Sequence, residues 1–338
     1  MDTPFIKGLV SIITPAYNAA PFLEETMSSV KAQTYEAWEW IIADDGSDDD
    51  TVAIVEKAFK KDVRIRLLPW GGEKRLAAGA RNRAMQHARG EFFAFLDADD
   101  LWEPEKTGRQ VAYLREHPEA DAICCWHDLF GDKERVKLES RMMNFLMHAK
   151  QICDRSDLLK ELPFQTSTLL MRRGCYGKIG GMDEDPRLRS GQDVEYFARL
   201  IEACNVHRLM ETLTHYRLTS LDDSLNRSHF TPQNQAAWNV FEVMNEKGYF
   251  TPGEARGKRS SLYYDQAINN LFHFDAPFRP FLIRSILSGH PPLRAMITFS
   301  LSFLGRPLLK KTLLWMLSVV NQWKLKKAKK AGAVLIDS

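Results

Sequence analysis

The sequence predicts an α/β fold with a mainly parallel central sheet flanked by helices, followed by a helical C-terminal extension. Short apolar runs and segments of helical spacing alternate four times within about the first 100 residues, which is typical of a parallel sheet with helices on both faces. Polar clusters follow three of the apolar runs, at 15–18, 44–48 and 97–100. Ligands bind at the carboxyl ends of the strands in such sheets. From about residue 232 onward the apolar spacing is helical.

The boundaries of the elements follow from the apolar runs and from the residues between them. Pro15 ends the first run, and Pro21 suits the first turn of a helix because its ring fixes φ. Residues 130–165 are polar and are expected to be irregular. The predicted strands span 9–14, 38–43, 63–68, 91–96, 120–128 and 166–171, and the predicted helices span 20–32, 51–60, 79–88, 104–116 and 193–204.

The composition is that of a globular protein. The 338 residues are 44% hydrophobic and 27% charged, and the net charge of +2 argues against nucleic acid as a partner. The five cysteines form no Cys-x-x-Cys pair, so reduced, buried thiols are expected. The chain has no signal-peptide pattern at its start and no apolar run of the roughly 18 residues that span a bilayer. A cytoplasmic location is therefore expected.

The acidic run Asp97-Ala98-Asp99-Asp100 directly follows a hydrophobic strand. Two carboxylates one residue apart on a tight turn provide the oxygen ligands that Mg²⁺ and Mn²⁺ prefer. The runs 48–50 and 183–185 match the same pattern, but neither follows a continuous apolar strand. The position of residues 97–99 therefore predicts a metal site there, and the alternative is a solvated acidic turn.

Two further motifs suggest a nucleotide ligand. In Asp44-Asp45-Gly46-Ser47, a carboxylate can accept a hydrogen bond from a pyrimidine N–H, while Gly46 permits close approach of the backbone. An ordinary Asp-Gly turn is the alternative. In Gly79-Ala80-Arg81-Asn82-Arg83, an arginine in the first turn of a helix offers a fork of donors suited to a diphosphate, and the alternative is an unremarkable basic face.

Asp193 lies near the start of a predicted helix, in Gly191-Gln192-Asp193-Val194-Glu195. A carboxylate at that position is favoured by the helix dipole, so helix capping is one interpretation. The other is a general base that takes a proton from an attacking hydroxyl.

Taken together, these motifs resemble the family 2 glycosyltransferases, which have the GT-A fold and invert the anomeric centre. The resemblance covers about residues 8–220. It is specific because several blocks occur in the family's order and spacing. The blocks are Val10-Ser11-Ile12-Ile13-Thr14-Pro15-Ala16-Tyr17-Asn18, Gln33-Thr34-Tyr35 with Asp44-Asp45-Gly46-Ser47-Asp48, Ala80-Arg81-Asn82-Arg83-Ala84, and Gly90 through Trp102.

The resemblance implies a role for each matching residue. Asp193 would be the catalytic base, although the family has Glu-Asp where this chain has Gln192-Asp193. Arg217, or a later residue such as His229, would touch the diphosphate. Asp99, together with Asp97, would bind Mn²⁺ or Mg²⁺. The remaining donor-binding residues would be Pro15 and Tyr17 at the nucleobase, Asp45 on the base, Arg81 near the base or diphosphate, and Asp97 and Ala98 at the ribose or donor sugar.

The expected activity is metal-dependent transfer, with inversion, of a sugar from a nucleotide-sugar to a hydroxyl of a glycan or lipid-linked glycan, in cell-surface polysaccharide synthesis. A UDP-sugar is the favoured donor, with GDP and dTDP still open. One alternative is a sugar-nucleotide nucleotidyltransferase, which would carry a Gly-rich loop where this chain has Pro15-Ala16-Tyr17-Asn18. The other is a non-catalytic, membrane-associated scaffold that retains the fold.

The expected domains are 1–230, with a donor half of about 1–110 and an acceptor half of about 111–230, and a helical region at 231–338. Pro307 opens a predicted helix with apolar residues at Leu309, Leu313, Met316 and Val320, and a lysine-rich segment follows. Residues 307–330 could lie on an anionic membrane surface, which would place the protein peripherally on the inner face of the cell membrane. The alternative is a core-packing helix with a solvated tail.

Overall fold

The structure is a computed structural model that describes residues 5–72, 76–133, 135–136, 152–154, 165–219, 235–272, 277–288, 293–304, 306–309 and 311–313. These residues form two compact units. The first contains the described parts of Met1–Val136 and Ala149–Ser220, and the second contains the helices after Leu221. The expected domain boundary near residue 230 lies outside the described residues, as does most of 130–165.

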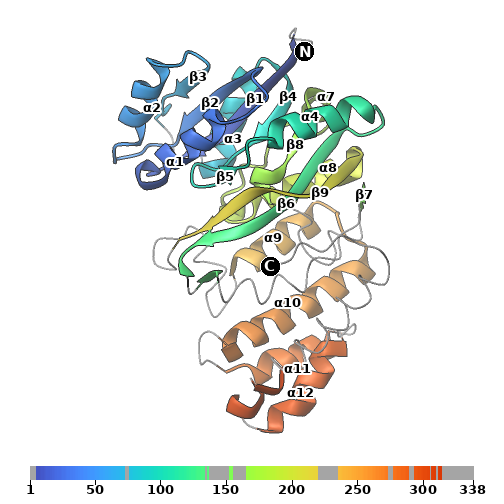
Figure 1. The fold of residues 1–338 in the computed structure, drawn as a ribbon. Helices are drawn as coiled ribbons and strands as arrows, with labels where there is room; N and C mark the ends of the chain where they lie inside the picture. Colours follow the sequence, from blue (N-terminus) through green and yellow to red (C-terminus); the bar gives the residue numbers. More distant parts are fainter. Residues whose placement is uncertain are drawn as a thin grey trace. The chain divides into compact units, whose positions relative to one another are not determined.

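The first unit is built on one mixed, mostly parallel sheet (Figure 1). Its described strands are β1 (Ile6–Ala16), β2 (Trp38–Asp44), β3 (Ile65–Leu68), β4 (Gly90–Phe95), β5 (Leu101–Trp102), β6 (Ala122–Gly131), β7 (Ile152–Cys153), β8 (Leu170–Arg172) and β9 (Val206–Leu218). Their order is β3-β2-β1-β4-β8-β6-β9-β5, and β7 pairs with β9. The first four strands are parallel, and β8 runs antiparallel to both β4 and β6. The expected α/β class and mainly parallel sheet are therefore confirmed.

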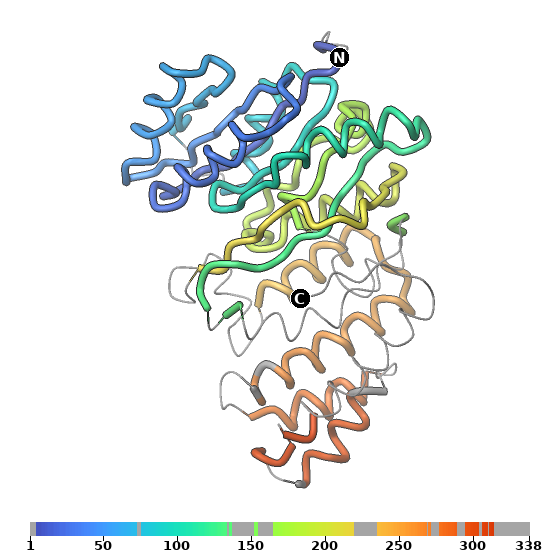
Figure 2. The backbone as a smooth tube through the Cα atoms, in the orientation of Figure 1, coloured from blue at the N-terminus to red at the C-terminus, as the bar shows by residue number. Residues whose placement is uncertain are grey.

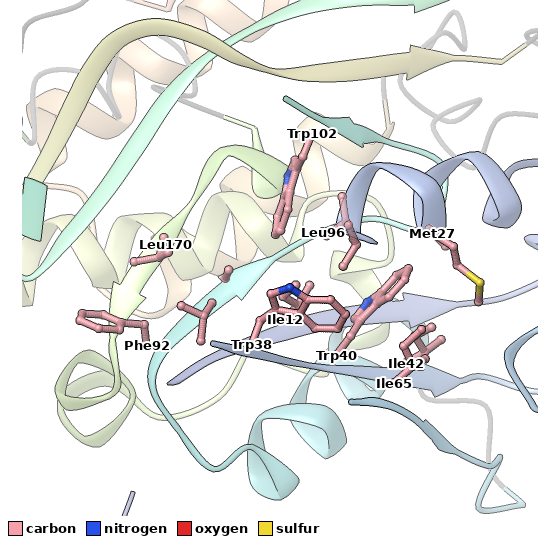
Figure 3. Packing of buried hydrophobic residues seen from close by; sticks show 14 of the residues in the cluster. Ile12, Met27, Trp38, Trp40, Ile42, Ile65, Phe92, Leu96, Trp102 and Leu170 are labelled. Atoms are coloured by element: carbon pink, nitrogen blue, oxygen red, sulfur yellow. The ribbon is translucent and has the colours of Figure 1, made fainter. Parts of the chain in front are cut away.

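Helices cover both faces of this sheet. They are α1 (Ala20–Lys31), α2 (Thr51–Phe59), α3 (Leu76–His87), α4 (Lys106–Glu116), α7 (Arg173–Ile179) and α8 (Gln192–Ala203). Successive strand residues face opposite sides, so Ile12 and Phe92 pack with α1, α2 and α4, whereas Ile13 and Phe93 pack with α3, α7 and α8. Figure 3 shows the first of these layers, with Trp40 and Met27 among its buried side chains. The two layers fix the strand ends from which the functional loops leave.

The second unit is helical, as expected for the C-terminal extension. Its elements are α9 (Gln235–Glu246), α10 (Pro252–Phe272), α11 (Arg279–Leu287), α12 (Leu293–Leu301) and the 3₁₀ turn η4 (Ser302–Leu304). Leu309 and Leu313 are buried in its core with Leu271 and Leu282. The described start of the segment at 307–330 thus packs inward, and the part beyond residue 313 lies outside the described residues. No described helix is long and apolar enough to cross a membrane.

The structure corrects several predicted elements. Residues 166–168 form a 3₁₀ turn, η1, and the strand β8 begins only at Leu170. The strand β9 was not predicted because polar side chains such as Arg208 and Thr214, both buried, break its apolar pattern. Figure 2 shows β9 lying beside β6 along its length, a parallel pairing of segments far apart in sequence. The helix α7, which contains two glycines, and the two-residue strands β5 and β7 were also missed.

Candidate active site

The loops after β1, β2 and β4 leave the sheet at the same edge. Ala16 pairs with Asp44 in the β1–β2 register, and Ile13 pairs with Phe95 in the β1–β4 register. The backbone N–H of Asp45 continues the first pairing by donating to the Ala16 carbonyl at 2.8 Å. The three polar clusters at 15–18, 44–48 and 97–100 therefore lie at one edge, as the sequence predicted.

The loop after β2 is stabilised by its own side chains and by the loop after β1. The carboxylate of Asp44 accepts hydrogen bonds from the backbone N–H groups of Gly46 at 3.0 Å and of Ser47 at 3.2 Å. Asn18, at φ 49°, donates its N–H to the Ser47 hydroxyl and accepts from the Asp48 N–H, both at 3.0 Å. Asp44 therefore shapes the turn, and the neighbouring carboxylate, Asp45, is the one predicted to contact the nucleobase.

Two aromatic side chains lie at these loops. Tyr17, predicted to stack on a nucleobase, is 38% exposed. Trp70, which the sequence reasoning missed, is 48% exposed, and its ring packs directly on Gly46, where a Cβ would lie 3.2 Å from the indole. A large aromatic residue just after a predicted strand was the available signal. Pro15 lies at the carboxyl end of β1, paired with Ala43.

The acidic turn after β4 is anchored by Ser167, a residue of η1. The hydroxyl of Ser167 accepts from the Asp97 backbone N–H at 3.0 Å and donates to Asp100 Oδ2 at 2.5 Å. The other carboxylate oxygen of Asp100 accepts from the backbone N–H of Arg217 at 2.9 Å. Asp100 is buried and fully occupied in these contacts, so it holds the turn in place and leaves Asp97 and Asp99 as the candidate metal ligands.

The Ala98 side chain points into the protein and not toward a ligand. Its methyl group is buried in the same hydrophobic layer as Met27, and its carbonyl accepts from the Thr26 hydroxyl at 2.9 Å. Any contact between Ala98 and a donor would therefore go through the backbone N–H.

Negative charge accumulates at this turn. Burial, and secondarily the charge of Asp97, raise the pKa of Asp99 to about 6. Burial and the charges of Asp99 and Asp97 raise the pKa of Asp100 well above its usual value. Excess negative charge of this kind fits a divalent cation, and Asp97 and Asp99 would supply the hard oxygen ligands that Mg²⁺ and Mn²⁺ require. In the described part of the chain no three His, Cys, Asp or Glu side chains cluster as a metal site, so remaining ligands would come from water and a diphosphate.

Arg81 connects the acidic turn to the start of α8. Its buried guanidinium forms an ion pair with Asp97. The side-chain amide of Gln192 is satisfied when its nitrogen donates to the Leu188 and Arg189 carbonyls and its oxygen accepts from Arg81 Nη1 at 3.3 Å. Arg81 therefore contacts both Asp97 in the acidic turn and Gln192, the residue directly before Asp193.

Asp193 lies in the first turn of α8 and is half-buried. Its Oδ1 accepts from the Val194 N–H at 3.0 Å, a contact within the first turn, and the N-cap of the helix is Gly191. The other acid of this turn, Glu195, is fully buried and ion-paired with Arg199 at 2.8 Å. Of the two acids, Asp193 is therefore the one that a substrate could reach.

Arg217, predicted to touch the diphosphate, lies against the acidic turn. Its Nε donates to the Asp99 carbonyl at 2.7 Å, and its guanidinium pairs with Glu25. The guanidinium also stacks on the Phe130 ring, 4.3 Å from the centroid. His229, the alternative to Arg217, lies outside the described residues.

His215, on the same strand as Arg217, bridges two carboxylates that the sequence reasoning did not connect. Its Nδ1 lies 2.6 Å from Asp128 Oδ1, and its Nε2 lies 2.9 Å from Glu103 Oε1. The hydrogen bond and charge of Asp128, followed by those of Glu103, raise the pKa of His215 despite its partial burial. This ion network joins β9 to β6 and to the residue that follows β5.

Comparison with known proteins identifies the family. The model of glycosyl transferase family 2 matches residues 11–180, half of the chain. The chain belongs to glycosyl transferase family 2. It is therefore a glycosyltransferase, and the matched range includes Asp45, Arg81, Asp97 and Asp99.

Relatives of this family 2 glycosyltransferase take part in cell-surface polysaccharide synthesis. TuaG of Bacillus subtilis, named for teichuronic acid biosynthesis, is 32% identical over 65% of this chain and 83% of its own length. WfgD of Escherichia coli is 45% identical, but over only 31% of this chain and 41% of its own length. It is named as a UDP-Glc:alpha-D-GlcNAc-diphosphoundecaprenol β-1,3-glucosyltransferase.

Solved structures of other glycosyltransferases share the GT-A fold with this chain. The TarS 1–349 fragment of S. aureus in complex with UDP-GlcNAc matches 97% of this chain and 93% of its own, with a TM-score of 0.58 at 17% identity. The mannosyltransferase PcManGT of Pyrobaculum calidifontis, in complex with GDP-Man and Mn²⁺, matches 93% of this chain and 87% of its own, with a TM-score of 0.56 at 18% identity. The expected GT-A fold is confirmed.

Proposed function

We propose that this chain is an inverting, metal-dependent glycosyltransferase that moves a sugar from a UDP-sugar to a hydroxyl of a glycan or lipid-linked glycan. The observation that carries the proposal is the acidic turn at Asp97–Asp99, held between Arg81 and Arg217 at the carboxyl edge of the sheet. Two carboxylates and two guanidiniums at one place suit a metal-bound diphosphate.

The nucleoside would lie at the loops after β1 and β2. Asp45 would accept a hydrogen bond from the base, and Tyr17 would stack on it beside Pro15. The UDP-GlcNAc complex of TarS supports a uridine nucleotide, whereas the GDP-Man complex of PcManGT shows that the fold also takes a guanosine nucleotide. A pyrimidine ring would offer Asp45 one N–H donor, which UDP and dTDP both supply, and the UDP-GlcNAc complex of TarS leads us to favour UDP.

The diphosphate would lie over the acidic turn. Asp99, with Asp97, would hold Mn²⁺ or Mg²⁺, and a bound cation supplies neutralisation of the charge that builds on the leaving diphosphate. Arg217, fixed by the Asp99 carbonyl and by Phe130, would provide a guanidinium for the diphosphate. Arg81 orients the carboxylate of Asp97 through their ion pair.

Asp193 would act as the base. As the acceptor oxygen forms its bond to the anomeric carbon, the bond from that carbon to the diphosphate oxygen breaks, and the hydroxyl proton goes to the Asp193 carboxylate. A single displacement from the face opposite the leaving group inverts the anomeric centre. The contact between Gln192 and Arg81 supports the proposal because it joins the start of α8 to the donor side.

The acceptor class follows from the relatives. WfgD acts on a sugar linked to diphosphoundecaprenol, and TuaG belongs to teichuronic acid synthesis. We therefore propose a glycan or lipid-linked glycan acceptor, presented at the cytoplasmic face of the membrane.

A screen of nucleotide-sugars for metal-dependent hydrolysis tests the donor, because glycosyltransferases slowly hydrolyse their donor when no acceptor is present. With the donor identified, Asp193→Asn is expected to lower transfer by about 10³-fold while donor affinity stays within about twofold, as for loss of a general base. Glu202→Gln, an exposed change on the same helix, is the matched control. Near-normal transfer by Asp193→Asn would show that Asp193 is not the base.

A further inference from the structure

Residues 276–336 of the chain contain basic residues but no acidic ones. No Asp or Glu occurs between Asp275 and Asp337. The same stretch contains eleven basic residues: Arg279, Arg284, Arg294, Arg306, Lys310, Lys311, Lys324, Lys326, Lys327, Lys329 and Lys330. A segment of this length without a single acid complements a strongly anionic partner.

Large apolar side chains are exposed in the same stretch. Leu287 is 78% exposed and Phe303 is 71% exposed, well beyond what is usual for such residues in a packed helical core. The exposed apolar set in the second unit is Ile283 and Leu287 on α11, Met296 and Ile297 on α12, Phe303 on η4, and Leu308.

Four of these side chains form two stripes that meet at one end. Arg279, Ile283 and Leu287 are spaced by four residues and so lie along one face of α11. Along α12 and η4, Met296 and Phe303 are separated by seven residues, or about two turns. The stripes meet where Arg279 donates to the Ser302 carbonyl at 2.5 Å and its guanidinium lies 5.3 Å from the Phe303 ring centroid. We name Ile283, Leu287, Met296 and Phe303, with the exposed bases Arg279 and Arg284 of α11, the apolar–basic face.

The apolar–basic face differs from the helix face expected at 307–330. Leu309 and Leu313, the first two apolar positions of that expected face, are buried in the core of the second unit. They are therefore unable to reach a membrane without unfolding, whereas Leu308, directly before Leu309, is half exposed.

We propose that the apolar–basic face binds the surface of an anionic phospholipid bilayer. Apolar side chains would enter the boundary between headgroups and acyl chains, while arginine side chains pair with phosphates, as in interfacial helices. An RNA partner would explain the positive charge but not the exposure of the apolar side chains of Leu287 and Phe303. Membrane binding would place the protein where the proposed lipid-linked acceptor lies. The observations behind it come from the second unit alone and do not depend on the donor chemistry.

Sedimentation of the full chain with vesicles tests the proposal. Phosphatidylcholine vesicles with about 30% phosphatidylglycerol should bind the protein, pure phosphatidylcholine should bind it at least about tenfold more weakly, and about 0.5 M NaCl should release it. The double variant Leu287→Ser/Phe303→Ser should lose at least about 30-fold in vesicle affinity. The matched control is Val63→Ser/Met210→Ser, which removes two apolar side chains that are 76% and 53% exposed in the first unit and should bind normally.

Each other outcome overturns the proposal. Normal vesicle binding by the Leu287→Ser/Phe303→Ser variant would place the contact elsewhere, for example in 314–338. A wild-type dimer that this variant converts to monomer, without vesicle binding, would make the face an interface between two copies. Binding of a short RNA in place of vesicles would assign the charge to nucleic acid. Donor hydrolysis without vesicles and the circular dichroism spectrum should both be unchanged in the double variant. A wild type that binds vesicles but hydrolyses no donor would contradict the proposed function and leave the membrane proposal standing.

Discussion

Ser167 is the residue on which the geometry of the acidic turn depends most. Its single hydroxyl accepts from the Asp97 N–H and donates to the buried Asp100 carboxylate. Its carbonyl also accepts from the Trp102 indole N–H at 2.8 Å, which fixes the chain just after the turn. Removing the hydroxyl leaves a backbone donor and a buried carboxylate oxygen without partners, and each such loss costs about 1–3 kcal/mol.

Ser167→Ala is therefore expected to weaken Mn²⁺ binding in the presence of UDP by about tenfold, because Asp97 and Asp99 are no longer held in place. Electron paramagnetic resonance of free Mn²⁺ measures this without any turnover. Ser167→Thr keeps the hydroxyl and should recover most of the affinity. Unchanged Mn²⁺ affinity in Ser167→Ala would mean that the turn is positioned by other contacts.

His215 should titrate above the ordinary histidine value of 6.5, because Asp128 and Glu103 both stabilise its charged form. A raised folded pKa means that the network stabilises the fold fully below pH 6.5, and that this contribution is lost as pH rises through the raised value. Side-chain ¹⁵N NMR, assigned with His215→Gln, measures the titration, and Asp128→Asn should lower the midpoint. A midpoint at or below 6.5 in the wild type would contradict the network.

At the scale of elements, close packing of β1 against β4 restricts which residue types can occupy the first position of β4. A Cβ on Gly90 would lie 2.5 Å from the Leu9 carbonyl oxygen and 2.8 Å from the Ser11 backbone nitrogen. Backbone atoms of a central strand have little room to move, so the two strands would have to separate. The acidic turn follows β4 directly, which makes this pairing important for the site.

Gly90→Ala is expected to lower the free energy of unfolding of the first unit by about 2–4 kcal/mol, through overpacking at the strand pair. Gly174→Ala is the matched control, because nothing lies within 4 Å of a Cβ at that position in α7. The control should be neutral or slightly stabilising, since alanine favours a helix. Thermal unfolding followed by circular dichroism compares the two, and equal melting temperatures would contradict the packing account.

The elements that the sequence predicted best are those with a simple apolar period. The parallel strands β1, β2 and β4 are continuous apolar runs because both of their faces are buried, and each ends in polar residues. The strand β9 has buried polar residues, such as Arg208, and so shows no such period. The helix at 79–88 was predicted to start at Gly79 but starts at Leu76, which has φ 58°.

At the scale of the whole chain, the site could be predicted in part. Carboxyl ends of neighbouring parallel strands share an edge, so Asp45 and Asp97 could be placed together from their positions after strands. The contacts that orient the two carboxylates could not be predicted from the positions of the strands. Ser167 lies in η1, directly before β8, which pairs with β4. Arg217 lies on β9, which pairs with β6, and both residues reach the acidic turn only in the folded chain.

The family assignment and the proposed chemistry stand on different observations. Membership of glycosyl transferase family 2 follows from the match over residues 11–180. Metal dependence, inversion and the roles of Asp99 and Asp193 remain proposals that depend on the charges and contacts at the acidic turn.

Calorimetric titration of UDP with and without Mn²⁺, on the wild type and on Asp99→Asn, tests the central claim most directly. The account predicts that Mn²⁺ tightens UDP binding by at least about tenfold in the wild type, because the cation joins the carboxylates to the diphosphate. In Asp99→Asn the two titrations should give the same weak affinity. Equal UDP affinity with and without Mn²⁺ in the wild type would contradict the account.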